Sequence, residues 1–106
     1  MKEISQELLE TIVQKLVDGL NPEKIILFGS HAYGSPTESS DIDLLVIVPS
    51  STEPRHLRAR QAYACLWGIT APVEIFVATA QEVEEAMEAS TSFLKQIIQS
   101  GRLLYG

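Results

Sequence analysis

The apolar residues near the N-terminus recur every three or four positions and form one stripe, which consists of Leu8, Leu9, Ile12, Val13, Leu16, Val17 and Leu20. This spacing predicts an amphipathic helix. Ser5 suits the N-cap of that helix, and Asn21-Pro22 suits its end. A second helix is predicted over residues 55–67, where it is stopped by Gly68.

Short apolar runs elsewhere in the chain predict strands. Residues 24–28 are almost wholly apolar, as in a strand buried on both faces, and residues 41–48 and 73–78 are rich in Ile, Leu and Val. Residues 103–105 are predicted to form a short edge strand. The order α-β-loop-β-α-β-α-α therefore predicts an α/β (α+β) fold, a small sheet with helices packed against it.

The last two helices are predicted from local signals. Thr79 and Glu82 have the spacing of a capping box, which predicts a helix start. Residues 90–92 are Ser-Thr-Ser and are expected to break that helix before a final one that ends at Ser100.

Length and charge indicate a single-domain protein that does not act on a nucleic acid polymer. The 106 residues fit a single domain spanning 1–106. The net charge of −6, from 8 Lys and Arg against 14 Asp and Glu, argues against a nucleic acid polymer as substrate. The one basic run, residues 55–60, is interpreted as a solvated helix face.

Other features predict a cytoplasmic protein that does not enter a membrane. A single cysteine, Cys65, permits no intramolecular disulfide and fits a reducing compartment. Its apolar neighbours predict a buried side chain. No apolar run reaches the roughly 20 residues of a membrane span, and the N-terminus lacks the apolar core of a secretory signal.

Asp41 and Asp43 are the first candidate chemical groups. Side chains two residues apart on a strand point to the same face, with Cα atoms about 6.6 Å apart. Two such carboxylates can hold hard cations such as Mg²⁺ together with substrate phosphates. The alternative is that Asp41 ends a loop as a cap while Asp43 pairs with a neighbouring base.

Gly29-Ser30, directly after a buried strand, is the second candidate. Glycine lets a phosphate approach the backbone, and serine offers a hydroxyl and an amide to its oxygens. A plain strand-ending turn is the alternative.

Glu74 is the third candidate, because an acid within an apolar strand is rarely without a role. It lies on the strand face opposite Val73, Ile75 and Val77. If its strand neighbours residues 41–48, Glu74 can join a metal site or accept a proton from an attacking hydroxyl. Otherwise it is a half-exposed glutamate of an edge strand.

Together, Gly29-Ser30, ten residues, and then Asp41-Ile42-Asp43 resemble the nucleotidyltransferase superfamily of DNA polymerase β. The chain resembles its small stand-alone members, the minimal nucleotidyltransferases (MNT proteins), over nearly its whole length. The resemblance implies the nucleotidyltransferase fold, a small mixed β-sheet with helices packed against it. It also implies two Mg²⁺ ions held by Asp41, Asp43 and Glu74, Glu74 as general base, and ATP as substrate with its triphosphate held by Gly29 and Ser30.

The resemblance further implies a partner. MNT proteins commonly pair with a small helical HEPN protein as antitoxin, and some transfer AMP to a tyrosine of it. Many relatives carry arginines after the Gly-Ser, where this chain has His31 and Tyr33.

Three functions follow from these expectations. The first is an Mg²⁺-dependent adenylyltransferase acting on a HEPN partner, as a homo- or hetero-oligomer. The second is an antitoxin that masks its partner by contact without catalysis. The third is one subunit of a larger small-molecule transferase.

Overall fold

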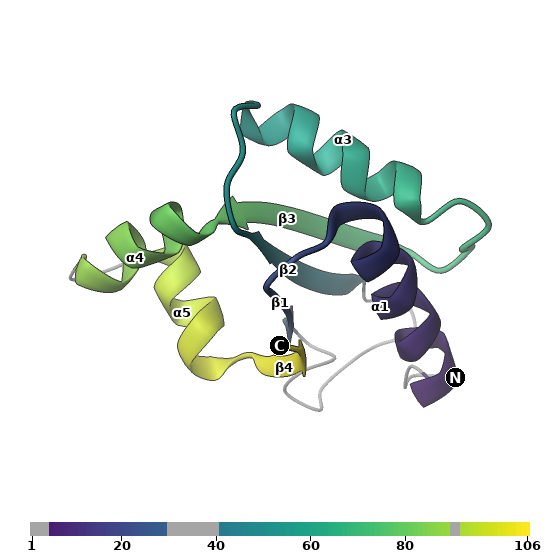
Figure 1. The fold of residues 1–106 in the computed structure, drawn as a ribbon. Helices are drawn as coiled ribbons and strands as arrows, with labels where there is room; N and C mark the ends of the chain where they lie inside the picture. The colour runs from purple at the N-terminus through teal and green to yellow at the C-terminus, as the bar shows by residue number, and fades with distance from the viewer. Residues whose placement is uncertain (1–4, 30–40, 90–91) are drawn as a thin grey trace.

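A mixed four-stranded sheet is the centre of the molecule (Figure 1). The computed structural model describes residues 5–29, 41–89 and 92–106. The strand order is β3-β2-β1-β4, with bounds β1 Lys24–Phe28, β2 Ile42–Val48, β3 Val73–Thr79 and β4 Arg102–Tyr105. Strand β1 runs antiparallel to β2 and β4, and β2 runs parallel to β3. The predicted α/β class and mixed sheet are confirmed.

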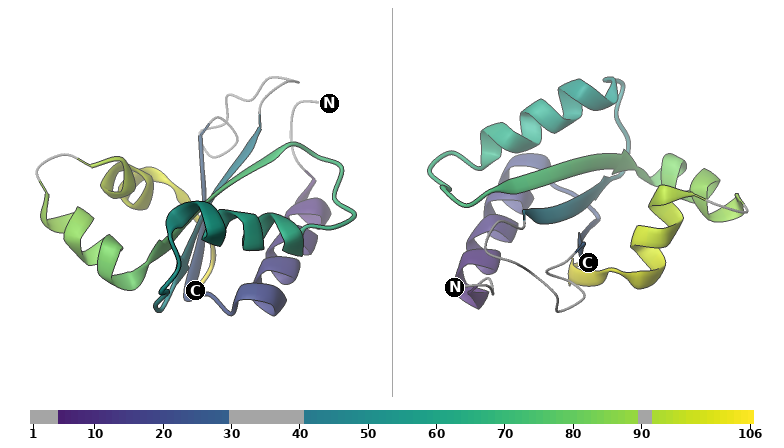
Figure 2. Two further views of the ribbon diagram at one scale, coloured as in Figure 1. Left: turned by 90° about the horizontal axis from the view of Figure 1, so that it is seen from above. Right: turned by 180° about the vertical axis from the view of Figure 1, so that it is seen from behind.

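Two helices cover each face of this sheet, as Figure 2 shows with the sheet seen nearly edge-on. Helices α1 (Gln6–Leu20) and α3 (Arg55–Cys65) lie on one face, and α4 (Ala80–Glu88) and α5 (Phe93–Ser100) lie on the other. Successive side chains of a strand point to opposite faces, and because both faces are covered, β1 and β2 are buried along almost their whole length. Among the described helices, none is long and apolar enough to cross a membrane.

The two faces have separate hydrophobic cores. The larger core lies under α1 and α3 and contains Leu9, Ile12, Leu16, Ile25, Leu27, Ile42, Leu44, Val46, Val48, Ala62, Leu66, Ile75 and Val77. The smaller lies under α4 and α5 and contains Ile26, Phe28, Leu45, Ile47, Ala78 and Ile97. Strands β1 and β2 contribute to both cores, which confirms burial on both faces for Ile25 to Phe28, whereas Lys24 is exposed.

The predicted starts of α1 and α4 are confirmed by their caps. The Ser5 side chain accepts a hydrogen bond from the Leu8 amide at 3.0 Å. Thr79 and Glu82 form the reciprocal capping box of α4. Ser92 caps α5, while residues 90–91 lie outside the described residues. Asn21 ends α1 in the left-handed conformation, with φ of 50°.

Cys65 is half-buried and packs against the larger core, and its Sγ lies 3.3 Å from the carbonyl oxygen of Gln61. The expected burial is therefore met in part. Gly19 of α1 lies so close that a Cβ at that position would collide with Cys65 Sγ. The close approach of α1 to α3 thus depends on a small residue at position 19.

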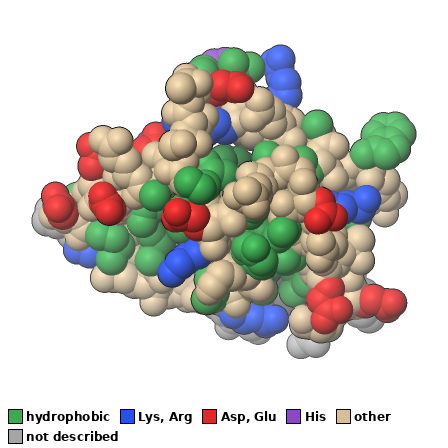
Figure 3. Space-filling model, viewed as in Figure 1, with side chains coloured by type: hydrophobic (Ala, Val, Ile, Leu, Met, Phe, Trp, Pro, Cys, Tyr) green, Lys and Arg blue, Asp and Glu red, His purple; other side chains and the backbone are tan. Residues whose placement is uncertain are grey.

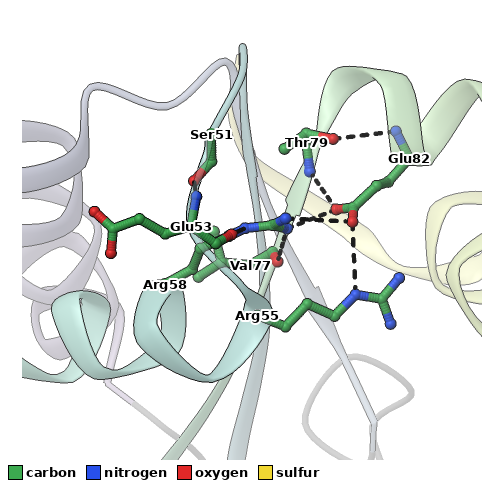
Figure 4. A network of polar contacts seen from close by, with 7 residues as sticks. All are labelled: Ser51, Glu53, Arg55, Arg58, Val77, Thr79 and Glu82. Carbon is green, nitrogen blue, oxygen red and sulfur yellow. Dashed lines mark hydrogen bonds and ion pairs between the residues drawn. The ribbon is translucent and has the colours of Figure 1, made fainter.

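The basic run at residues 55–60 is not a uniformly solvated face, because Arg58 points inward (Figure 4). Its side chain is only 11% exposed, and Nη1 lies 2.7 Å from Glu82 Oε1. It also donates to the carbonyl oxygens of Glu53 (2.8 Å) and Val77 (3.3 Å). The interpretation of a solvated face is wrong for Arg58, because a partly buried guanidinium requires partners that local sequence does not reveal.

Arg58 also closes the outer edge of β3. Strand β3 is at the edge of the sheet, so its outward backbone groups lack a strand partner. The Val77 carbonyl accepts from Arg58, and the Ile75 amide donates to the Tyr63 hydroxyl at 3.0 Å. Side chains of α3 therefore satisfy two backbone groups that would otherwise pair with another strand.

Two opposing effects act on the pKa of Glu82. Burial favours the neutral acid and raises the pKa, whereas hydrogen bonds from Arg58 and the Thr79 amide, with the charges of Arg58 and Arg55, lower it. The hydrogen bonds and the nearby charges together outweigh the effect of burial, so the pKa of Glu82 lies below its ordinary value of 4.5. Ionised Glu82 therefore stabilises the fold fully above its ordinary pKa, and this contribution is lost as the pH falls through its folded pKa.

We predict that Glu82→Gln lowers the free energy of unfolding at pH 7 by about 1–3 kcal/mol, because it leaves the charge of Arg58 poorly paired. The difference from wild type should shrink as the pH falls below 4.5. Chemical denaturation between pH 7 and pH 3 measures it. Glu84→Gln, on the exposed side of the same helix, is the control. A difference of the same size at every pH would contradict the account.

Candidate active site

A row of three residues crosses the sheet near the ends of its strands. Asp43 of β2 lies opposite Phe28 of β1 and opposite Glu74 of β3. Paired residues of neighbouring strands point to the same face, and adjacent strands are about 4.8 Å apart. The carboxylates of Asp43 and Glu74 therefore lie side by side on the face that α4 and α5 cover. The expectation that the strand of Glu74 neighbours residues 41–48 is confirmed.

Asp41 lies just before β2 and is exposed. It precedes Asp43 by two residues, so continued extended backbone puts it on the same face. The Ile42 amide donates to the Pro72 carbonyl at 2.9 Å, which keeps β2 and β3 paired up to this point. Asp41, Asp43 and Glu74 thus come from the same end of two paired strands.

Gly29 follows β1 directly and lies against Asp43. Its φ is +76°, a conformation that favours glycine. A Cβ built at Gly29 would collide with Asp43 Oδ2. Any other residue at position 29 would therefore displace the carboxylate or change the backbone. Glycine is required here both by conformation and by contact, which a strand-ending turn alone would not explain.

Ser30, His31 and Tyr33 lie outside the described residues. The triphosphate-binding role expected of Gly29 and Ser30 therefore stays a prediction.

The donor chemistry of the row fits a hard cation. Asp41, Asp43 and Glu74 offer only carboxylate oxygens, the ligand type that Mg²⁺ prefers. Within residues 5–29, 41–89 and 92–106, no group of three or more His, Cys, Asp or Glu side chains is gathered closely enough to hold a metal ion. Glu74 is exposed on its edge strand, which leaves room for its side chain to turn. The metal ligand set stays a prediction.

An aromatic cluster that was not predicted from the sequence lies next to the carboxylate row. Phe28, Phe76 and Phe93 meet with ring centroids 5.6–5.9 Å apart. Phe28 is paired with Asp43, and Phe76 follows Glu74 by two residues on the same face. The spacing of Glu74 and Phe76 was the available signal, but the approach of Phe93 from α5 required the fold.

A cavity of about 770 Å³ adjoins this cluster at the free edge of β3. Its walls come from β3, from the start of α3, from α4 and from the start of α5; the apolar residues that line it include Leu45, Ala59, Phe76, Ala86, Phe93 and Leu94. Figure 3 shows hydrophobic side chains in the hollow between α3 and α4. Arg55, His56, Glu82 and Glu85 complete its lining.

Comparisons with known proteins agree with the fold. The family model described as polymerase beta, nucleotidyltransferase matches residues 10–106. The chain is also similar to the crystal structure, at 1.40 Å resolution, of a Sulfolobus solfataricus protein provisionally assigned as a nucleotidyltransferase. The TM-score is 0.61 and the identity 23%, over 74% of this chain and 70% of the other, which shows a shared fold.

No curated protein matches the chain. The family match covers nearly the whole sequence, including both candidate carboxylate strands and the Gly29 turn. The chain therefore belongs to the polymerase β-like nucleotidyltransferase family.

Proposed function

We propose that this chain is an Mg²⁺-dependent adenylyltransferase, which transfers AMP from ATP to a tyrosine of a HEPN partner and thereby acts as an antitoxin. The general activity follows from membership of the nucleotidyltransferase family. The observation that carries the proposal is the register of Asp43 with Glu74, which puts two carboxylates side by side next to Gly29. Glycine at that point leaves the backbone open to a phosphate.

The proposed reaction is an in-line displacement at the α-phosphate of ATP. A bond forms between the tyrosine oxygen and the α-phosphorus, and the bond from that phosphorus to the bridging oxygen of the β-phosphate breaks. Pyrophosphate leaves, and the proton of the tyrosine hydroxyl passes to the Glu74 carboxylate. Asp41, Asp43 and Glu74 would hold the Mg²⁺, whose charge would offset the negative charge of the phosphates.

A second candidate function is an antitoxin that masks its partner by contact alone. Tyr63, in the last turn of α3, is 44% exposed, and Trp67, just after the helix, is 88% exposed. Exposed aromatic residues are enriched at protein interfaces, so this end of α3 favours a bound partner. It lies on the other side of the sheet from the carboxylate row, and masking would leave that row without a role.

The proposal predicts that label passes from α-phosphate-labelled ATP to a HEPN protein that co-purifies with this chain, in the presence of Mg²⁺. Asp43→Asn should abolish this transfer, because it removes charge from the predicted metal site. The fold and the complex with the partner should survive. Gel autoradiography measures transfer, and co-purification measures the complex.

Glu10→Gln is the matched control, because Glu10 is an exposed acid on α1, across the sheet from Asp43. It should transfer label like wild type. An unlabelled wild-type partner in a stable complex would support masking in place of catalysis. Dissociation of the Asp43→Asn complex would instead give Asp43 a structural role.

Glu74 should act mainly on the chemical step. We predict that Glu74→Gln slows transfer by about 10²–10⁴-fold, the usual contribution of a general base. Its effect on Mg²⁺-ATP affinity should be much smaller. Glu74→Asp should retain much of the activity, because it keeps a carboxylate. Single-turnover kinetics and nucleotide titration separate the two effects, and equal loss of both would leave Glu74 with its role as metal ligand but without the role of general base.

A further inference from the structure

We infer that the cavity at the free edge of β3 is the acceptor site, and that it takes a phenolic side chain, the tyrosine of the acceptor protein. This inference rests on the proposed function and deepens it. Four features of the described residues support this inference. They are the position of the cavity relative to the carboxylate row, the aromatic lining of the cavity, the volume of the cavity, and the hydrogen bonds already made at the outer edge of β3.

The order of groups across the sheet indicates that the cavity lies on the side of the carboxylate row from which the acceptor would approach. Gly29, at the end of β1, marks the proposed phosphate end of the site, followed by Asp43 on β2 and Glu74 on β3. In an in-line displacement the attacking and leaving oxygens lie on opposite sides of the phosphorus. If pyrophosphate leaves toward Gly29, the acceptor hydroxyl must approach from the side of β3. The cavity lies at the outer edge of that strand.

The aromatic lining selects the kind of side chain. Phe76 and Phe93 line the cavity, and they are 37% and 56% exposed, so parts of both rings are open to a ligand. A phenol ring can stack on or pack edge-on against them. Glu74 does not itself line the cavity, but it precedes Phe76 by two residues on the same strand face, so their Cα atoms lie about 6.6 Å apart. The exposed Glu74 side chain can turn toward a phenol that packs against Phe76.

The size of the cavity suits an inserted side chain, and the chemistry of the β3 edge disfavours an added β-strand. A volume of about 770 Å³ accommodates an aromatic side chain together with its neighbours in a polypeptide. An added β-strand is disfavoured, because Tyr63 and Arg58 already bond the Ile75 amide and the Val77 carbonyl. The acceptor protein is therefore expected to insert a side chain into the cavity and not to pair its backbone with β3.

N-acetyl-tyrosinamide is a suitable probe, because it presents the phenol without requiring a known partner. In a ¹H–¹⁵N NMR titration of the whole chain, it should shift the amides of Phe76, Ala86 and Phe93 saturably. N-acetyl-serinamide should not. Ala86→Trp, which fills the cavity from α4, should raise the dissociation constant of N-acetyl-tyrosinamide by about tenfold or more.

Ala64→Trp is the matched control, since Ala64 is an exposed alanine of α3 that does not line the cavity. It should bind the probe like wild type. Ala59→Trp, which fills the cavity from α3, serves if Ala86→Trp does not fold. Shifts that lie outside the cavity, absence of binding by wild type, or unchanged binding by both filled variants would overturn the assignment.

A parallel titration with Mg²⁺-ATP separates this inference from the proposed function. The nucleotide should shift Gly29 and Asp43, with the same affinity in wild type and Ala86→Trp. Weaker nucleotide binding by Ala86→Trp would mean that the cavity holds the base, and it would overturn the acceptor assignment. Failure of wild type to bind Mg²⁺-ATP would contradict the proposed function, and this result is read independently of the tyrosinamide titration.

Discussion

The register of β2 with its two neighbours is the constraint on which the site depends. Antiparallel pairing with β1 puts Asp43 opposite Phe28, and parallel pairing with β3 puts it opposite Glu74. A slip of one residue would turn the carboxylate of Asp43 to the opposite face of the sheet, toward α1 and α3. The same slip would expose apolar residues of the larger core. Burial of that core therefore fixes the position of the carboxylates.

The carboxylate row itself opposes stability. Like charges on directly opposite residues of neighbouring strands repel, and Asp43 and Glu74 are such a pair. The cores beneath the helices on both faces offset this cost, and the Arg58–Glu82 pair links α3 to α4 across the edge of β3. A fold that holds two acids together in this way resembles a site prepared for a cation, because local rules of stability are typically broken where function requires it.

Local signals predicted most of the elements, because caps and apolar spacing are properties of short segments. Ser5 and the Thr79–Glu82 box mark helix starts that the structure confirms. The burial of Arg58 was not predictable, because its partner Glu82 is 24 residues away and on another helix. The aromatic cavity was missed for the same reason, since Phe28, Phe76 and Phe93 come together only through sheet order and helix packing.

Within the candidate site, sequence spacing singled out Asp43, Glu74 and Gly29, and the fold places Asp43 beside each of the other two. The acid pair on one strand could be inferred from the two-residue period. The pairing of Asp43 with Glu74 could be stated only as a condition, because strand order is a long-range property. The expected contribution of Ser30 falls outside the described residues and stays a prediction.

Paramagnetic broadening by Mn²⁺ tests the central claim most directly, because Mn²⁺ accepts the same oxygen ligands as Mg²⁺ and broadens only nearby NMR signals. A small amount of Mn²⁺ would be added to the ¹⁵N-labelled chain with a non-hydrolysable ATP analogue. The account predicts broadening centred on the amides of Gly29, Asp43 and Glu74, and its loss in Asp43→Asn. Broadening centred on another acidic region, such as Glu84 to Glu88 of α4, would contradict the assignment of the carboxylate row as the nucleotidyltransferase site.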